Sequence, residues 1–382
     1  MFPLESPWLD AELLSYRDSV RRFVREQLEP QQPRWHAQGH VDREAWLAAG
    51  QLGCLLADVP EGYGGAGGDF RHMAVFWAAL AEVGDTAFGA PLQAVVARYL
   101  LHHGTEAQQQ RHLPALAAGR SIAAIAITEP AAGSDLQGLK CRAVPHEGGY
   151  RINGSKCFVS NGHLADLVLL AVRTDERPGP KSLSLMLVET AGLRGFERGP
   201  IEPLLGRPGH DCCELFFNEV WLPAEALLGG EAGKGLAQLR RQLGYERAML
   251  GVMAQASMER ALALTLEHSR SRRIYGQPLF DLQHTRFTLA EVQAHVVMGR
   301  LLVDHCIAAQ LEGRLDEATA ALAKWRLSEM QGEVMDRCLQ LFGGAGYARE
   351  HPMARLYADA RVQRIYGGAN ELMKEVVAYA LP

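Results

Sequence analysis

The feature that most constrains the fold is a change of sequence pattern at two points along the chain. Residues 1–120 carry apolar side chains at helical spacing, residues 121–228 carry short β-prone runs between turn signals, and residues 229–382 return to long helical segments. No helix-length segment alternates with the β-prone runs, which favours an antiparallel sheet over a parallel one. We therefore predict an α+β chain of three domains: an N-terminal helical bundle, a central antiparallel β domain and a C-terminal four-helix bundle.

The same patterns predict the individual elements. Helical spacing predicts helices over residues 13–28, 74–83, 92–103, 236–268, 285–312, 315–341 and 370–380. Runs of β-prone residues predict strands over residues 122–127, 150–152, 157–160, 167–172, 183–188 and 214–217. Glycine-containing pairs, among them Asn153-Gly154 and Asn161-Gly162, predict turns between these strands.

The composition excludes several classes of protein. Of the 382 residues, 48% are hydrophobic and 22% are charged, which is the balance of a soluble globular chain rather than a disordered one. The net charge is -5 and no block of like charge occurs, so neither nucleic acid nor an anionic membrane is expected as the main partner. Uninterrupted apolar runs such as residues 167–172 are far shorter than the ~20 residues that a membrane span needs.

The cysteines and the N-terminus bear on the compartment. The seven cysteines contain no C-x-x-C pair, so neither a disulfide framework nor a zinc site is predicted, and no metal is expected. The first residues show no basic region followed by an apolar one, so no secretory signal is visible. With the strong preference for arginine over lysine, which suggests GC-rich coding, these features predict a cytoplasmic, bacterial protein.

Residues 62–67 match the dinucleotide-binding pattern G-x-G-x-x-G. That pattern requires a buried strand before it and a βαβ unit around it. Here Pro60 precedes the glycines and both flanks are helical. We therefore predict a loop between two helices.

Two other loops are stronger candidates for a ligand site. Residues 128–135 (TEPAAGSD) follow a predicted strand and combine hydroxyls, a proline turn and a glycine, which can present donors to an anion or a heteroaromatic ring. Residues 153–162 (NGSKCFVSNG) have the pattern of a hairpin. Taken singly, each segment is better explained as a turn or hairpin without a ligand.

Together with the rest of the chain, these two segments resemble the acyl-CoA dehydrogenase family, flavoproteins that α,β-desaturate acyl thioesters. The resemblance covers nearly the whole chain, and the α–β–α plan of the family agrees with the pattern described above. The other matching segments are residues 103–108, 113–116, 245–247, 272–276, 340–347 and 361–371, together with Gln283.

The resemblance implies non-covalently bound FAD. Thr128 and Ser160 match positions that contact the isoalloxazine ring. Phe158 stands where many members carry a tryptophan against that ring. Ser134 matches a position near both the cofactor pyrophosphate and the bound thioester.

The resemblance also implies a homo-oligomer, either a tetramer or a dimer, because several positions match residues that hold the FAD of a neighbouring subunit. Near the C-terminus, Ala369 replaces a threonine that contacts the flavin. Glu371, two residues further on, is also expected to bind the cofactor. The residues matched to the neighbouring subunit's FAD are Arg272, Tyr275, Gln283, Gln340 and Gly344.

The catalytic base is the main departure from the family pattern. In many members the base is a glutamate at the position that Gly367 occupies here. In the isovaleryl-CoA and long-chain branches it belongs to a Glu-Arg pair, which matches Glu246-Arg247. No cation lies three or four residues from Glu246, and Met249 and Leu250 form an apolar stripe with it, which predicts a raised pKa. By spacing alone, a surface glutamate is an equal alternative.

The family pattern also assigns the substrate side. The backbone N–H at Gly367 matches the donor that polarises the thioester carbonyl, and glycine retains that N–H. The missing side chain predicts additional room for a bulky or branched acyl chain. Tyr366 and Arg247 match the substrate side, although an ordinary helix-surface arginine is an alternative for Arg247.

The predicted function is FAD-dependent dehydrogenation of an acyl-CoA to the trans-2-enoyl-CoA. Glu246 serves as the base, flavin N5 accepts the hydride, and an electron-transfer flavoprotein accepts the electrons. Three alternatives remain: a flavin oxidase or monooxygenase of the same fold, a dehydrogenase of carrier-protein-bound acyl groups, and an inactive flavin-binding homologue.

Overall fold

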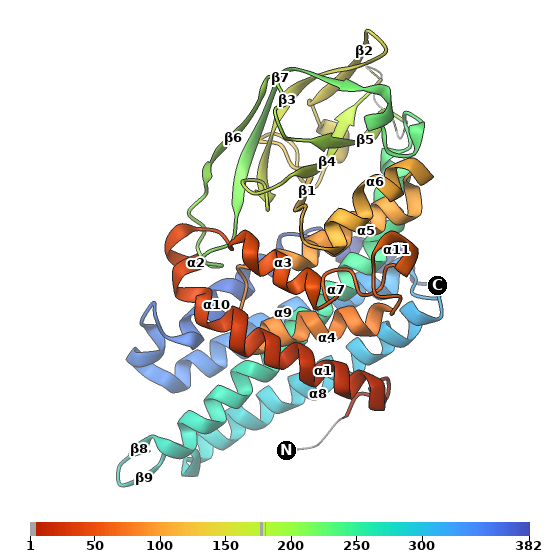
Figure 1. Cartoon of the computed structure of the whole chain (residues 1–382). Coiled ribbons are helices and arrows are strands. Elements are labelled where there is room, and N and C mark those ends of the chain that lie inside the picture. Colours follow the sequence, from red (N-terminus) through yellow and green to blue (C-terminus); the bar gives the residue numbers. More distant parts are fainter. Residues whose placement is uncertain (1–4, 176–178, 180) are drawn as a thin grey trace.

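A computed structural model describes residues 5–175, 179 and 181–382, and it shows a β-sheet domain seated on a larger helical body (Figure 1). The order of elements along the chain is α, then β, then α, as predicted. The helices before the sheet are α1 (Ala11–Phe23), α2 (Gln32–Gln38), α3 (Arg43–Gln51), α4 (Phe70–Glu82), α5 (Ala90–His103) and α6 (Glu106–Ala117).

The helices after the sheet include the three longest of the described chain. A small hairpin of β8 (Arg273–Ile274) and β9 (Gln277–Pro278) joins the first of them to the second. The sequence did not predict α10, which is short and starts at a proline. The helices are α7 (Gly235–Ser271), α8 (Gln283–Leu311), α9 (Glu317–Phe342), α10 (Pro352–Arg361) and α11 (Asn370–Tyr379).

Local capping determines where two of the N-terminal helices begin. Asp69 caps α4 through a capping box with His72, so the helix starts one turn before its predicted first residue. Thr105 and Gln108 form the equivalent box at the start of α6. The periodicity of apolar residues locates a helix but does not show its polar first turn.

The central domain is built on a seven-stranded sheet in the order β1-β4-β2-β3-β7-β6, with β5 pairing with β4. The predicted strands at residues 122–127, 167–172, 183–188 and 214–217 are confirmed except at their ends, whereas those at 150–152 and 157–160 are parts of one strand, and β2 and β6 were not predicted. The strands are β1 (Ala123–Ala126), β2 (Arg142–His146), β3 (Gly149–Ser160), β4 (Leu167–Arg173), β5 (Leu183–Glu189), β6 (Phe196–Ile201) and β7 (Cys212–Pro223).

The sheet is mixed, so the prediction of an antiparallel sheet was wrong for one part of it. β1 runs parallel to β4 over four residue pairs, and β2 makes one parallel pair with β4. The remaining pairings of this sheet are antiparallel. The parallel pair is possible because the β2–β3 hairpin lies between β1 and β4 in sequence and serves as the crossover connection.

The predicted turn at Asn153-Gly154 was also wrong. Both residues lie inside β3, which is continuous from Gly149 to Ser160. Gly154 has φ +146 and sits at a register shift against β7, and a Cβ placed on it would lie 2.7 Å from the Cα of Cys141. The glycine therefore marks a β-bulge at a close approach of two backbones rather than a turn.

β4 separates two hydrophobic cores. Leu167 and Leu169 point into the core shared with the helices, whereas Val168 and Leu170 point into the core of the sheet domain. A strand covered on both faces needs apolar residues at every position. This burial explains why residues 167–172 form an uninterrupted apolar run.

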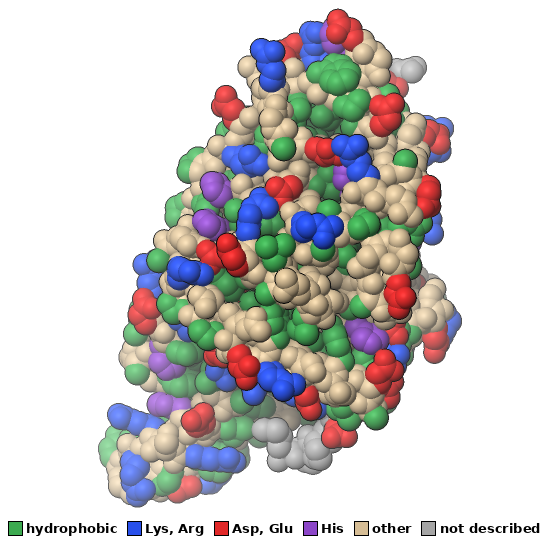
Figure 2. Space-filling model, viewed as in Figure 1, with side chains coloured by type: hydrophobic (Ala, Val, Ile, Leu, Met, Phe, Trp, Pro, Cys, Tyr) green, Lys and Arg blue, Asp and Glu red, His purple; other side chains and the backbone are tan. Residues whose placement is uncertain are grey.

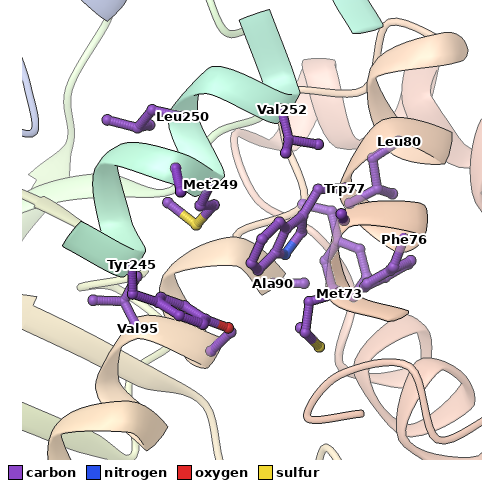
Figure 3. Close-up of a cluster of buried hydrophobic side chains, with 14 of the residues drawn as sticks. Met73, Phe76, Trp77, Leu80, Ala90, Val95, Tyr245, Met249, Leu250 and Val252 are labelled. Atoms are coloured by element: carbon purple, nitrogen blue, oxygen red, sulfur yellow. The ribbon is translucent and has the colours of Figure 1, made fainter. Parts of the chain in front are cut away.

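α7 is the longest helix, with 37 residues and a length of about 55 Å. It packs against α4, α5, α8, α9 and the sheet strand β5. Figure 3 shows its contact with the N-terminal helices, where Tyr245 lies beside Val95 of α5 and close to Trp77 of α4. The ring centroids of Trp77 and Tyr245 are 5.9 Å apart.

The glycine-rich segment 62–67 is a loop between α3 and α4, as predicted. Gly64 and Gly67 have positive φ, and a Cβ on Gly65 would lie 2.0 Å from the carbonyl oxygen of Val59. These glycines serve a tight turn between helices. No strand precedes them in the described part of the chain.

The visible surface carries charges of both signs, interspersed with apolar and uncharged side chains (Figure 2). Within residues 5–175, 179 and 181–382, no helix is long and apolar enough to cross a membrane.

Candidate active site

The turn before α11 lies directly against α7. Gly367 has φ +62, and a Cβ placed on it would lie 3.6 Å from Oε1 of Glu246. The two positions that the sequence suggested for the catalytic carboxylate are therefore neighbours in space. A carboxylate at residue 246 can act on nearly the same atoms as one attached at residue 367.

Leu250 occupies the space beside Gly367. Its Cδ1 atom lies 2.4 Å from the position that a Cβ of residue 367 would take, and the side chain is only 4% exposed. The additional room predicted from the missing side chain is therefore filled, at this point, by Leu250.

Glu246 is half-buried on the face of α7 that meets this turn. Burial raises the pKa of its carboxyl group, while the nearby charges of Arg247 and Lys324 oppose that shift. The direction of the net shift agrees with the sequence prediction. Lys324 reaches the site from α9, which spacing along α7 does not show.

Arg247 is buried, at 3% exposure, so the alternative of a helix-surface arginine is wrong. Its Nη1 atom lies 3.5 Å from Oε1 of Glu317, and burial lowers its pKa. Its Nε group makes no hydrogen bond within the described residues. This donor remains available to a polar ligand.

Lys324 is a site residue that the sequence analysis missed. It is 1% exposed, and its Nζ donates to the carbonyl oxygen of Gly368 at 2.7 Å and to Oδ1 of Asn370 at 2.9 Å. Burial and the charge of Arg247 lower its pKa to about 8. The sequence did contain a signal for its burial, because the residues three and four positions away on the helix are mainly small or apolar. These residues are Ala320, Ala321, Leu327 and Ser328.

Three of the predicted flavin residues form one wall of the sheet domain. The N–H of Cys157 donates to the carbonyl oxygen of Thr128 at 2.9 Å, which places the 128–135 loop beside the end of β3. Phe158 follows in β3 with φ +53 and 66% exposure, which is unusual for an aromatic residue within a strand. Ser160 ends the strand, and its Oγ lies 2.8 Å from Nε2 of His210.

A buried ion pair holds this wall together, and the sequence analysis missed it. Nζ of Lys156 lies 2.7 Å from Oε1 of Glu129, and both side chains are almost fully inaccessible. The carboxylate of Glu129 also accepts the backbone N–H groups of Lys140 and Cys141. Glu129 therefore ties the ligand loop both to β3 and to the start of β2.

The remaining predicted residues do not join this wall within one chain. Ser134 is exposed at the rim of the 128–135 loop, whereas Tyr366 and Ala369 are half-buried in the turn beside Glu246. The other residues are exposed: Arg272, Tyr275 and Gln283 at the β8–β9 hairpin, Gln340 and Gly344 at the end of α9, and Glu371 in the first turn of α11.

The β8–β9 hairpin projects from the helical body, away from the sheet domain (Figure 1). Tyr275 at its tip is 91% exposed and has φ +50. A group bound at the sheet-domain wall of one chain cannot be held by this hairpin of the same chain.

Comparison with known proteins identifies the family. Models of the acyl-CoA dehydrogenase N-terminal, middle and C-terminal domains match residues 10–120, 124–220 and 233–381. The long-chain specific acyl-CoA dehydrogenase, mitochondrial, of Mus musculus is 40% identical over 366 residues, covering 95% of this chain and 85% of that protein.

Solved structures give the same result. Acyl-CoA dehydrogenase from Geobacillus kaustophilus superposes with a TM-score of 0.96 at 36% identity, covering 98% and 99% of the two chains. A structure described as the electron transferring flavoprotein of Acidaminococcus fermentans has a TM-score of 0.92 at 30% identity, covering 97% and 98%. Glutaryl-CoA dehydrogenase from Mycobacterium smegmatis, in complex with FADH2, has a TM-score of 0.90 at 26% identity, covering 97% and 95%.

The fold and these matches define a flavin-dependent oxidoreductase with a sheet domain between two helical regions. The chain belongs to the acyl-CoA dehydrogenase family. FAD is the cofactor of this family, and the described residues suit it: the exposed ring of Phe158 offers a surface for stacking, and Ser160 provides a hydroxyl beside it.

Replacing Lys156 by methionine is expected to lower the free energy of unfolding by about 3 kcal/mol, because it leaves Glu129 as a buried charge without its cation. Urea unfolding followed by circular dichroism measures the change. Lys140→Met, at an exposed neighbouring lysine, is the matched control. Equal unfolding midpoints for the two variants would show that the buried pair does not stabilise the sheet domain.

Replacing Gly367 by alanine is expected to destabilise the protein by about 1–2 kcal/mol more than replacing Gly313, because its Cβ would overlap Leu250. Gly313 is the control, since it has a similar φ of +65 and open space around it. Thermal unfolding measures the difference, and the additional change Leu250→Ala should reduce it. If the two glycine variants melt alike, Leu250 does not restrict residue 367.

Proposed function

We propose that this enzyme removes the α-proton and the β-hydride from an acyl-CoA thioester and releases the trans-2-enoyl-CoA, with Glu246 as the base. The observation that carries the proposal is the 3.6 Å between Oε1 of Glu246 and the Cβ position of Gly367. An enzyme of this family needs a carboxylate at that place, and Glu246 is the one that reaches it among the described residues.

Burial prepares Glu246 for this role. A carboxylate that is taken out of water binds a proton more tightly, so the raised pKa makes Glu246 a stronger base than an exposed glutamate. The charges of Arg247 and Lys324 oppose that shift, because they stabilise the ionised carboxylate.

The backbone around Gly367 completes the site. We propose that its N–H donates to the thioester carbonyl oxygen and stabilises the negative charge that develops when the α-proton leaves. Bound FAD supplies the oxidant, because its N5 accepts the hydride from the β-carbon. Arg247 lies on the same helix as Glu246 and has one donor, its Nε, without a partner among the described residues, and we assign Arg247, with Tyr366 and Ser134, to the substrate side.

The cofactor contacts divide between two subunits in this proposal. Thr128, Phe158 and Ser160 hold the isoalloxazine ring, with Ala369 and Glu371 on the same side. The exposed hairpin and the end of α9 hold the FAD of a neighbouring subunit through Arg272, Tyr275, Gln283, Gln340 and Gly344. Their exposure in the single chain supports a homo-oligomer, a dimer or a tetramer.

An apolar stripe on α8 supports the same assembly. Phe287, Met298 and Leu301 are 60%, 53% and 55% exposed, and their spacing places them on one side of the helix. Apolar side chains gathered on one exposed helix face favour association, because contact with another copy removes them from water. We therefore place α8 in the interface between subunits.

The electrons leave the reduced enzyme to an electron-transfer flavoprotein in this proposal. We also propose a cytoplasmic location, which the seven free thiols support, since a reducing compartment keeps cysteines unpaired.

The variant Glu246→Gln is expected to retain FAD but to lose flavin bleaching by acyl-CoA, with a rate at least about 10²–10⁴ lower, because an amide cannot accept the α-proton. The measurement is anaerobic stopped-flow absorbance across straight, branched and aromatic acyl-CoAs. Glu267→Gln, an exposed residue on the same helix, is the control. Undiminished bleaching by the Glu246 variant would exclude this base, and peroxide formation during aerobic turnover would favour an oxidase.

The variant Met298→Glu, combined with Leu301→Glu, is expected to shift the protein to a smaller assembly, because it places charges within the apolar stripe. Size-exclusion chromatography with light scattering measures the mass, and absorbance measures the FAD content, which should fall in parallel. Val144→Glu, at an exposed apolar residue of β2, is the control. An unchanged mass would show that α8 does not lie in the interface between subunits.

A further inference from the structure

Lys324 is a buried cation without an ion-pair partner in the described part of the chain. Its Nζ is satisfied by two neutral oxygens instead, the carbonyl of Gly368 and the side-chain amide of Asn370. Burying an ammonium group costs free energy, and neutral acceptors offset less of that cost than a carboxylate would. A fully buried lysine in this arrangement therefore needs an explanation other than stability.

The two oxygens that bind Lys324 belong to the turn that carries Gly367. Gly367 and Gly368 have φ +62 and +90, a conformation that glycine adopts easily but also leaves easily. Lys324 fixes the carbonyl of Gly368, and Ser328, one turn further along α9, bonds the amide of Asn370 at 3.0 Å. The residues that directly follow Gly367 are therefore held from α9.

Lys324 also lies near Glu246, because it binds the carbonyl oxygen of Gly368, and the Cβ position of the preceding Gly367 is 3.6 Å from Oε1 of Glu246. The titratable and charged groups that face Glu246 are Arg247 on its own helix, Lys324 from α9, Tyr99 from α5 and Tyr366 from the turn. Lys324 in turn faces Arg247, Glu246 and, from α11, Glu371. Lys324 is thus the one cation from another element among the groups that shift Glu246 in the described structure.

We propose that Lys324 is a positioning residue of the dehydrogenation: its ammonium group fixes the Gly367–Gly368 turn for the thioester carbonyl and stabilises the negative charge of Glu246. This inference rests on the proposed function of Glu246 and Gly367. It adds a residue that touches neither the α-proton nor the carbonyl oxygen, and it assigns to α9 the alignment of the base with the carbonyl donor.

The positioning of the turn is tested by ligand binding, which needs no turnover. Holoenzyme carrying Lys324→Met is titrated with a trans-2-enoyl-CoA and with an S-alkyl-CoA thioether of the same length, which lacks the carbonyl. We expect the thioester to bind about tenfold more weakly than to the native enzyme, because the donor at Gly367 is no longer held. The thioether should bind with less than about a twofold change.

Equal weakening of the two ligands would indicate a general loss of structure and would overturn this part of the inference, as would no weakening of either. Asn370→Ala serves as a second variant, because it removes one of the two acceptors and leaves the lysine in place. It should weaken the thioester selectively, but less than Lys324→Met does. Lys374→Met, on α11 and paired with Glu329, is the matched control and should leave both affinities unchanged.

The charge effect is tested by the pH profile of kcat/KM. The lysine stabilises the carboxylate, so removing its charge raises the pKa of Glu246 and moves the acid limb of the profile to higher pH. For Lys324→Met we expect at least about a fivefold greater loss of kcat/KM below the limb than on the plateau above it. Lys324→Arg keeps the charge and should keep the native limb.

A profile lowered equally at every pH in Lys324→Met would overturn the charge effect, and a shifted limb in Lys324→Arg would do the same. If Glu246 is not the base, the Glu246→Gln variant will still show bleaching of its flavin by acyl-CoA. That result is measured separately from the pH profile. The binding titration does not depend on which residue takes the proton, so the two failures are distinguishable.

Discussion

The packing of α7 is the constraint on which the other parts of the molecule depend. This one helix contacts the N-terminal helices, the sheet strand β5 and the other long helices of the C-terminal region. Tyr245 anchors it at the centre, since its hydroxyl donates to the buried Asp58 at 2.9 Å and its ring meets Phe70 and Trp77. Glu246 is the next residue, so the anchor that joins the domains also fixes the start of the carboxylate side chain.

Two buried lysines support the two sides of the site. Lys156 binds Glu129 beneath the flavin-side loop, and Lys324 binds the turn beneath Gly367. Each lysine comes from a regular element, β3 or α9, and holds an irregular segment that hydrogen bonds of regular secondary structure do not fix. An active site built on loops gains rigidity in this way, since a charge-assisted hydrogen bond is stronger than one between neutral groups.

The sequence predicted what local patterns determine. The run at residues 167–172 became β4 because a strand covered on both faces is apolar throughout, and the long apolar periodicities became α7, α8 and α9. The turn predicted at Asn153-Gly154 was wrong because glycine occurs at β-bulges as well as in turns. The raised pKa of Glu246 was predictable from its own helix, whereas Lys324 and the Lys156–Glu129 pair join residues far apart in sequence and needed the folded chain.

The turn at Gly367 has an evolutionary consequence. A lone change from glycine at this position meets an unfavourable φ and the side chain of Leu250 at once, so every single-step replacement is penalised before any new carboxylate can work. A change at residue 250 that makes room beside residue 367 would therefore have to come first. The order of substitutions, more than their number, limits which side chains this position can acquire.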